Sequence, residues 1–111
     1  MSSVPPGTYL CAVKDIPDPG AISVEPGGGA DIIITRNGNI FRAYENSCPH
    51  QGTPLETFPG RFLTRDKQHL LCSTHGARFC IDDGMCISGP CKGKPLNPVQ
   101  IRLWRRRIVT I

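Results

Sequence analysis

Two cysteines each stand just before a histidine, and this pairing constrains the fold more than any other feature. Cys48-Pro49-His50 and Cys72-Ser73-Thr74-His75 are separated by 21 residues, and glycine follows each histidine within two positions. Chance placement of two such pairs in a short chain is improbable, and thiolate with imidazole is a common ligand set for metal ions. The sequence therefore predicts a metal site that brings the two segments together.

The spacing of the first pair bears on which metal is bound. Structural zinc sites usually separate paired ligands by two or more residues, whereas Cys48 and His50 have only the stiff Pro49 between them. A stiff loop of this kind favours a binuclear cluster, in which each loop gives a thiolate to one iron and an imidazole to the other. A zinc-bound structural module stays open as an alternative. A disulfide framework built from the six cysteines is disfavoured, because no secretory signal accompanies them.

The remaining sequence predicts one all-β domain over residues 1–111. With 12 Gly and 11 Pro residues in 111, long helices are disfavoured and short strands between turns are expected. The expected strands are Thr8–Lys14, Asp31–Thr35, Ile40–Glu45, Arg61–Thr64, Gln68–Leu71, Ala77–Ile81, Met85–Ser88, Val99–Leu103 and Arg107–Ile111, and Ala21–Val24 is a short apolar segment.

Two turns join neighbouring strands in this interpretation. Asn37-Gly38 lies between two β-branched or aromatic runs and predicts a hairpin with a type I′ turn. Asp82-Asp83-Gly84 predicts a second turn, which would place Cys80 opposite Cys86 across the hairpin. Cys11, Cys80, Cys86 and Cys91 are expected to be small buried side chains, and His69 a surface or partly buried structural residue.

The charge, the aromatic residues and the hydropathy of the chain argue against nucleic-acid and membrane binding. The net charge is +4, with Arg102, Arg105, Arg106 and Arg107 near the C-terminus, and we expect these to form a solvated strand edge and turn. Trp104 is expected to anchor the edge of the core. The aromatic residues do not alternate with the basic ones, so nucleic-acid binding is not expected. No segment predicts a membrane span or a signal peptide, so a cytoplasmic monomer without membrane partners is expected.

The two pairs and their surroundings resemble the cluster-binding loops of Rieske [2Fe–2S] proteins. The similarity includes Cys48-Pro49-His50-Gln51-Gly52, Cys72-Ser73-Thr74-His75-Gly76-Ala77-Arg78-Phe79 and the downstream Ser88-Gly89-Pro90. It implies an antiparallel β sandwich of about three small sheets with a small cluster-binding subdomain. The implied loops lie at about 46–54 and 70–79, with a covering loop at about 87–92. One [2Fe–2S] cluster per chain would be bound by Cys48, His50, Cys72 and His75.

Several positions differ from the high-potential members of that family. Thr53 and Thr74 stand where those proteins carry a disulfide between the loops, and Ala77 and Phe79 where they place hydroxyl donors to the cluster sulfurs. Hydrogen bonds to the sulfurs are a main influence on potential, so we expect the lower half of the Rieske range of roughly −150 to +300 mV.

The resemblance implies a ferredoxin that carries one electron at a time from a reductase to a terminal oxygenase. An accessory subunit of a larger reductase, similar to the small subunit of nitrite reductase, is the alternative. No catalytic residues are expected, because His69 is the one histidine left once His50 and His75 bind the cluster, and a mononuclear iron site needs two. The chain is thus predicted to be an electron-transfer component and not an enzyme.

Overall fold

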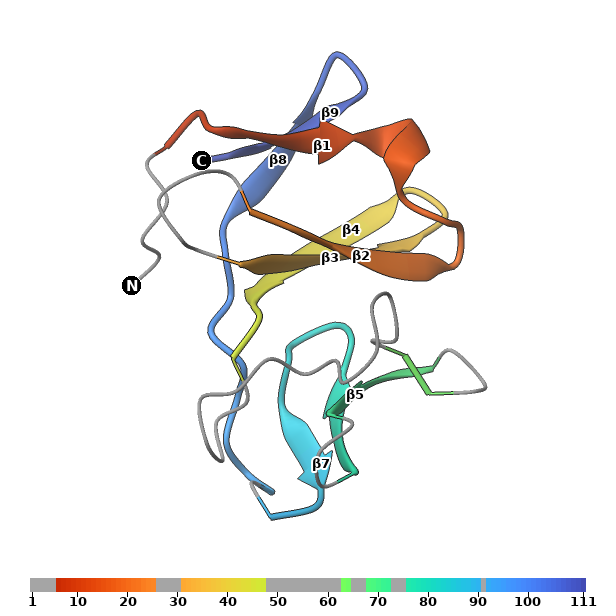
Figure 1. The fold of residues 1–111 in the computed structure, drawn as a ribbon, viewed down its shortest axis with the longest axis vertical. Coiled ribbons are helices and arrows are strands. Elements are labelled where there is room, and N and C mark those ends of the chain that lie inside the picture. The colour runs from red at the N-terminus through yellow and green to blue at the C-terminus, as the bar shows by residue number, and fades with distance from the viewer. Residues whose placement is uncertain (1–5, 26–30, 48–62, 65–67, 73–75, 91) are drawn as a thin grey trace.

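Three small antiparallel sheets follow one another along the long axis of the molecule (Figure 1). The structure is a computed structural model, and it describes residues 6–25, 31–47, 63–64, 68–72, 76–90 and 92–111. The first sheet has the order β1-β9-β8, with β1 at Tyr9–Ala12, β9 at Arg107–Thr110 and β8 at Ile101–Trp104. The second has the order β2-β3-β4, with strands at Gly20–Val24, Ile32–Asn37 and Ile40–Glu45. The third consists of β5, β6 and β7, at His69–Cys72, Ala77–Cys80 and Cys86–Ser88.

The predicted all-β sandwich with a small subdomain is confirmed, and most strand positions agree within one or two residues. The first strand is shorter than predicted, because a 3₁₀ turn, η1 (Val13–Asp15), replaces its end. The carboxylate of Asp15 accepts the Ala12 backbone N–H at 3.0 Å, which favours the turn over a longer strand. The predicted strand at 61–64 is represented by a single bridge from Leu63 to Leu70; residues 61–62 lie outside the described residues.

The hairpin at Asn37-Gly38 forms, but its turn type was predicted wrongly. Asn37 pairs with Ile40, so Gly38 and Asn39 are the two central residues. Gly38 has φ +63°, whereas Asn39 does not have a positive φ. Glycine at the first central position is typical of a type II′ turn, not of type I′.

Two hydrophobic cores share the strand β3. Ile32 and Ile34 pack in the core between the first two sheets, together with Leu10, Ala43, Val99 and Ile108. Ile33 points to the other face and joins the core of the third sheet, together with Leu70, Cys72, Phe79 and Leu96. All three isoleucines are fully buried. The unbroken β-branched sequence of β3 therefore reflects burial on both faces.

Tyr44 connects the second sheet to the third through packing and a hydrogen bond. Its ring is 2% exposed and lies in the core of the third sheet, although the residue belongs to β4. The phenol donates a hydrogen bond to the Ile81 carbonyl at 2.6 Å. Burial raises the pKa of Tyr44 to about 12, with Asp82 and Asp83 adding to the rise and Arg42 opposing it. A Cβ at Gly84 would lie 2.7 Å from the Tyr44 ring, so the turn residue has to be glycine for this contact.

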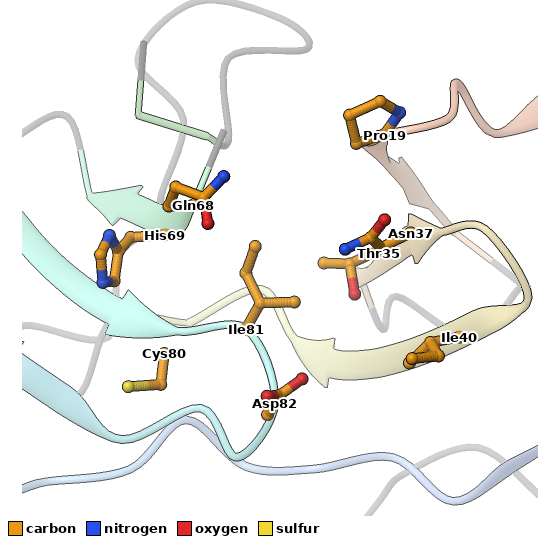
Figure 2. Close-up of a pocket in the computed structure, with 9 residues that line it drawn as sticks. All are labelled: Pro19, Thr35, Asn37, Ile40, Gln68, His69, Cys80, Ile81 and Asp82. Carbon is orange, nitrogen blue, oxygen red and sulfur yellow. The ribbon is translucent and has the colours of Figure 1, made fainter. Parts of the chain in front are cut away.

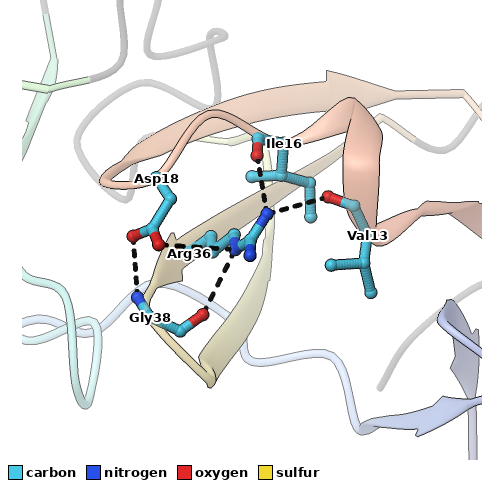
Figure 3. A network of polar contacts seen from close by, with 5 residues as sticks. All are labelled: Val13, Ile16, Asp18, Arg36 and Gly38. Atoms are coloured by element: carbon cyan, nitrogen blue, oxygen red, sulfur yellow. Dashed lines mark hydrogen bonds and ion pairs between the residues drawn. The ribbon is translucent and has the colours of Figure 1, made fainter.

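Arg36 holds the β3–β4 hairpin against the segment that follows β1 (Figure 3). Its guanidinium donates to the carbonyl oxygens of Val13 and Ile16, each at 3.3 Å, and to that of Gly38 at 3.2 Å. Asp18 lies 4.0 Å from the same guanidinium and accepts the Gly38 N–H at 2.7 Å. These bonds fix the turn between β1 and β2.

No helix among the described residues is long and apolar enough to cross a membrane.

Candidate metal centre

Of the four predicted ligands, the structure describes Cys72. Cys48, His50 and His75 lie outside the described residues. Within the described part of the chain, no group of three or more His, Cys, Asp or Glu side chains is arranged to hold a metal ion. The geometry that can be examined is thus the surroundings of Cys72.

Cys72 is the last residue of β5 and is 1% exposed. It pairs with Ala77, the first residue of β6, and its carbonyl accepts the Gly76 N–H at 2.9 Å. Gly76 has φ +70°, a left-handed conformation that glycine adopts without steric cost. The chain therefore reverses direction between Cys72 and Gly76, where β5 and β6 meet.

Gly89, which belongs to the segment predicted as the covering loop, packs against Ala77. Ser88, the last residue of β7, pairs with Arg78, and Gly89 follows with φ +99°. A Cβ at Gly89 would stand 2.8 Å from the Ala77 Cα and 3.1 Å from its Cβ. The backbone at Gly89 thus packs directly on Ala77, the strand partner of Cys72.

The walls beside Cys72 are apolar. Ala77 and Phe79 are almost completely buried in the same core and carry no side-chain hydrogen-bond donor. Cys86 is also buried there, and its thiol donates to the Ser88 carbonyl at 3.1 Å. A buried sulfur with apolar neighbours is a suitable environment for a soft thiolate ligand.

The comparisons with known proteins identify the family. The Rieske [2Fe-2S] domain family matches residues 7–105. This chain belongs to the Rieske [2Fe–2S] family. Its cofactor is accordingly one [2Fe–2S] cluster, whose centre carries two Cys and two His ligands in this class. The described surroundings of Cys72 fit that cluster, because they supply a thiol at a buried strand end.

Two similar proteins are ferredoxins, and a third similar chain comes from a complex that contains a ferredoxin. The Rieske chain is 34% identical over 83 residues to ferredoxin CarAc of Metapseudomonas resinovorans, covering 74% of this chain and 72% of CarAc. It is 32% identical over 79 residues to the ferredoxin component of the alkene monooxygenase system of Xanthobacter autotrophicus. That match covers 71% of this chain and 61% of the relative's length. A solved complex of reduced oxygenase and oxidized ferredoxin in carbazole 1,9a-dioxygenase contains a chain with 27% identity and a TM-score of 0.73. The match covers 90% of this Rieske chain and 96% of that chain.

The predicted approach of Cys80 to Cys86 is wrong. Cys86 pairs with Phe79, because the β6–β7 register shifts between Arg78 and Phe79. Cys80 therefore lies on the opposite face of β6 from the core, half-buried, and its thiol is free. Cys11 is buried in the core between the first two sheets, as expected, and burial raises its pKa to about 11, with Asp15 adding to the rise. Cys91 lies outside the described residues.

His69 is partly buried, as predicted, and lies opposite Cys80 across β5 and β6. Both line a cavity of about 360 Å³ between the second and third sheets (Figure 2). Asp82 and Gln68 contribute from the third-sheet side, and Thr35 and Asn37 from the second sheet. Sequence patterns did not indicate this cavity, because it forms where two sheets meet and no single segment contains its lining.

Proposed function

We propose that this Rieske chain is a one-electron carrier that passes electrons from a reductase to a terminal oxygenase. The observation that carries the proposal is the family match over residues 7–105, together with the burial of Cys72 at the end of β5. One relative is the ferredoxin component of an alkene monooxygenase system, and a similar chain occurs in a solved complex of oxygenase and ferredoxin, which supports this choice of partners. In the same proposal the chain acts as a cytoplasmic monomer and has no catalytic residues of its own.

The proposed ligands are the thiolates of Cys48 and Cys72 and the imidazoles of His50 and His75. Two neutral imidazoles in place of two thiolates remove two negative charges, so the cluster accepts an electron more easily than an all-cysteine cluster. When bound, the cluster supplies one-electron oxidation and reduction. The chain's own task is to orient the four side chains and exclude water from the cysteine side.

The described residues near Cys72 also support a potential in the lower half of the Rieske range. Ala77 and Phe79 are buried beside Cys72 and offer no hydroxyl. Without such donors, the negative charge added on reduction receives less stabilisation from side chains.

The ligand assignment can be tested with matched variants. His75→Ala should lose the cluster, whereas His69→Ala, three residues before Cys72 on the same strand, should keep it. Cys72→Ser should lose or alter the cluster, whereas Cys86→Ser, buried in the same core, should keep it. Iron and sulfide content, the visible spectrum and the EPR signal of the reduced protein report the outcome.

A cluster retained with its normal EPR signal in His75→Ala or Cys72→Ser would contradict the assignment. A colourless protein that contains zinc in place of iron would contradict the function itself. Voltammetry of the intact protein should show one reversible one-electron couple. If protein that contains iron showed no such couple, the proposal would also be overturned.

A further inference from the structure

A strongly basic pocket lies at the end of the molecule opposite the third sheet. It has a volume of about 380 Å³ and is formed between β1, η1 and the β8–β9 turn. We call it the arginine pocket; its lining residues are Tyr9, Ala12, Lys14, Arg105, Arg106 and Arg107. Figure 1 shows the β8–β9 turn and the third sheet at opposite ends of the long axis, so this pocket is separate from the candidate metal centre.

Four cationic side chains line the pocket without a carboxylate to neutralise them. Lys14 and the three arginines are exposed, and among the described residues the one ion pair joins Arg36 to Asp18. The nearest acidic residue in sequence, Asp15, uses its carboxylate to accept the Ala12 N–H. Like charges gathered in this way repel one another, so the cluster has an electrostatic cost unless an anion binds there.

The turn that carries the arginines is itself strained. Trp104 pairs with Arg107, so Arg105 and Arg106 are the two central residues of the hairpin. Their φ angles are +50° and +61°, in the left-handed region where side chains are disfavoured and Asn-Gly is the usual sequence. Strain of this kind is retained where the surrounding structure or a function requires it.

Two contacts hold the turn in place over the pocket. The Arg106 carbonyl accepts the Val13 N–H at 3.0 Å, which ties the turn to η1. The Arg105 guanidinium lies over the Trp104 ring, 4.8 Å from its centre. Trp104 is 45% exposed, so the expectation that it anchors the edge of the core is wrong. Its exposed ring instead fixes the position of a cation, which reduces the side-chain entropy lost on binding.

We propose that the arginine pocket binds a phosphate-bearing anion with two or more negative charges. Arginine forks form paired, charge-assisted hydrogen bonds to phosphate oxygens, and three arginines with one lysine suit a diphosphate better than a single carboxylate. The volume also exceeds what one phosphate fills, and the exposed face of Tyr9 offers an apolar wall to an attached organic group. Diphosphate groups occur in soluble metabolites, and phosphomonoester groups occur in lipid headgroups; both supply this chemistry.

Inorganic pyrophosphate is the probe for the soluble source, titrated calorimetrically into the cluster-loaded protein at low ionic strength. The double variant Arg105→Gln/Arg107→Gln should bind it at least about tenfold more weakly, since each lost charge-assisted bond costs roughly that factor or more. The charge-matched control is Lys92→Gln/Lys94→Gln, which removes two exposed cations beyond Gly89. This control should bind within about twofold of the parent, because screening leaves only a weak effect at that distance.

Vesicles test the lipid source. Sedimentation with phosphatidylcholine vesicles containing about one part in five phosphatidic acid should carry the protein down, and the arginine variant should stay in solution, if a headgroup is the ligand. Binding in either arm that depends on the arginines supports the proposal and identifies the source. Absence of binding in both arms, or equal weakening by the lysine control, would overturn it. The visible spectrum of each variant confirms that the fold and cluster are intact, so the result is independent of the electron-carrier proposal.

Discussion

Substitution of Gly89 by alanine tests whether the covering loop depends on close contact with Ala77. The new Cβ would lie 2.8 Å from the Ala77 Cα, a backbone atom that cannot rotate away. The residue also has φ +99°, so any side chain there is strained. We expect the strain to cost about 1–3 kcal/mol and the overlap to add about 1–3 kcal/mol of unfolding free energy.

Gly93→Ala is the matched control. Gly93 has φ +89°, but a Cβ there meets nothing within 4 Å, so this variant carries the strain without the overlap. Urea unfolding of both cluster-loaded proteins, together with the rate of bleaching of the visible spectrum, separates the two contributions. Gly89→Ala should be less stable than Gly93→Ala and should bleach faster, because the displaced loop exposes the core beside Cys72. Equal stability and equal bleaching in the two variants would refute the argument that contact with Ala77 positions the loop.

Three further perturbations follow from individual contacts. Tyr44→Phe should lose about 1–3 kcal/mol near neutral pH, because the Ile81 carbonyl loses its donor. In the parent protein Tyr44 has a pKa of about 12, above the ordinary value of 10.0, so its contribution is complete below pH 10 and decreases by about 1.4 kcal/mol per pH unit from pH 10 to 12. Urea unfolding from pH 10 to 12 should show a smaller decrease in the free energy of unfolding for the variant than for the parent. The same pH dependence in both proteins would contradict the raised pKa of Tyr44. Arg105→Asn/Arg106→Gly should raise the thermal midpoint, by relieving about 1–2 kcal/mol of strain per residue, while weakening pyrophosphate binding at least about tenfold; a lower midpoint would refute the strain. Ala77→Ser should raise the reduction potential by tens of millivolts, about 59 mV corresponding to a tenfold change for one electron, and a redox titration that shows no shift would mean that position 77 donates nothing to the cluster.

The fold could be predicted from local patterns because its strands are short and separated by distinct turn residues. Ile40–Glu45 begins and ends where its aromatic and β-branched residues and the Asn37-Gly38 turn predicted. The errors arose where a tertiary contact decided the outcome. The Val13 N–H bonds to Arg106, ninety-three residues later in the chain, and this contact accompanies the 3₁₀ turn that shortens β1.

The candidate site was predicted from ligand spacing, which depends on metal chemistry and not on packing. The structure describes Cys72 at the end of β5, and the assignment of Cys48, His50, Cys72 and His75 as ligands stays a prediction. The β6–β7 register could not be predicted, because the shift between Arg78 and Phe79 depends on how the turn closes. The position of Trp104 was predicted wrongly for a related reason. The local sequence, an aromatic residue followed by arginines, is the same whether the ring packs in the core or lies against a guanidinium.

Because β3 is buried on both faces, its alternate side chains pack in two different cores. Removing a methyl group from Ile32 or Ile34 leaves a cavity in the core between the first two sheets, whereas the same change at Ile33 leaves a cavity in the core that contains Cys72. Each Ile→Val change removes about 0.5–1.5 kcal/mol of stability, so calorimetry alone would rank the three as equivalent. The visible spectrum should separate them: we expect Ile33→Val to bleach faster than Ile32→Val or Ile34→Val, because Ile33 shares its core with Cys72.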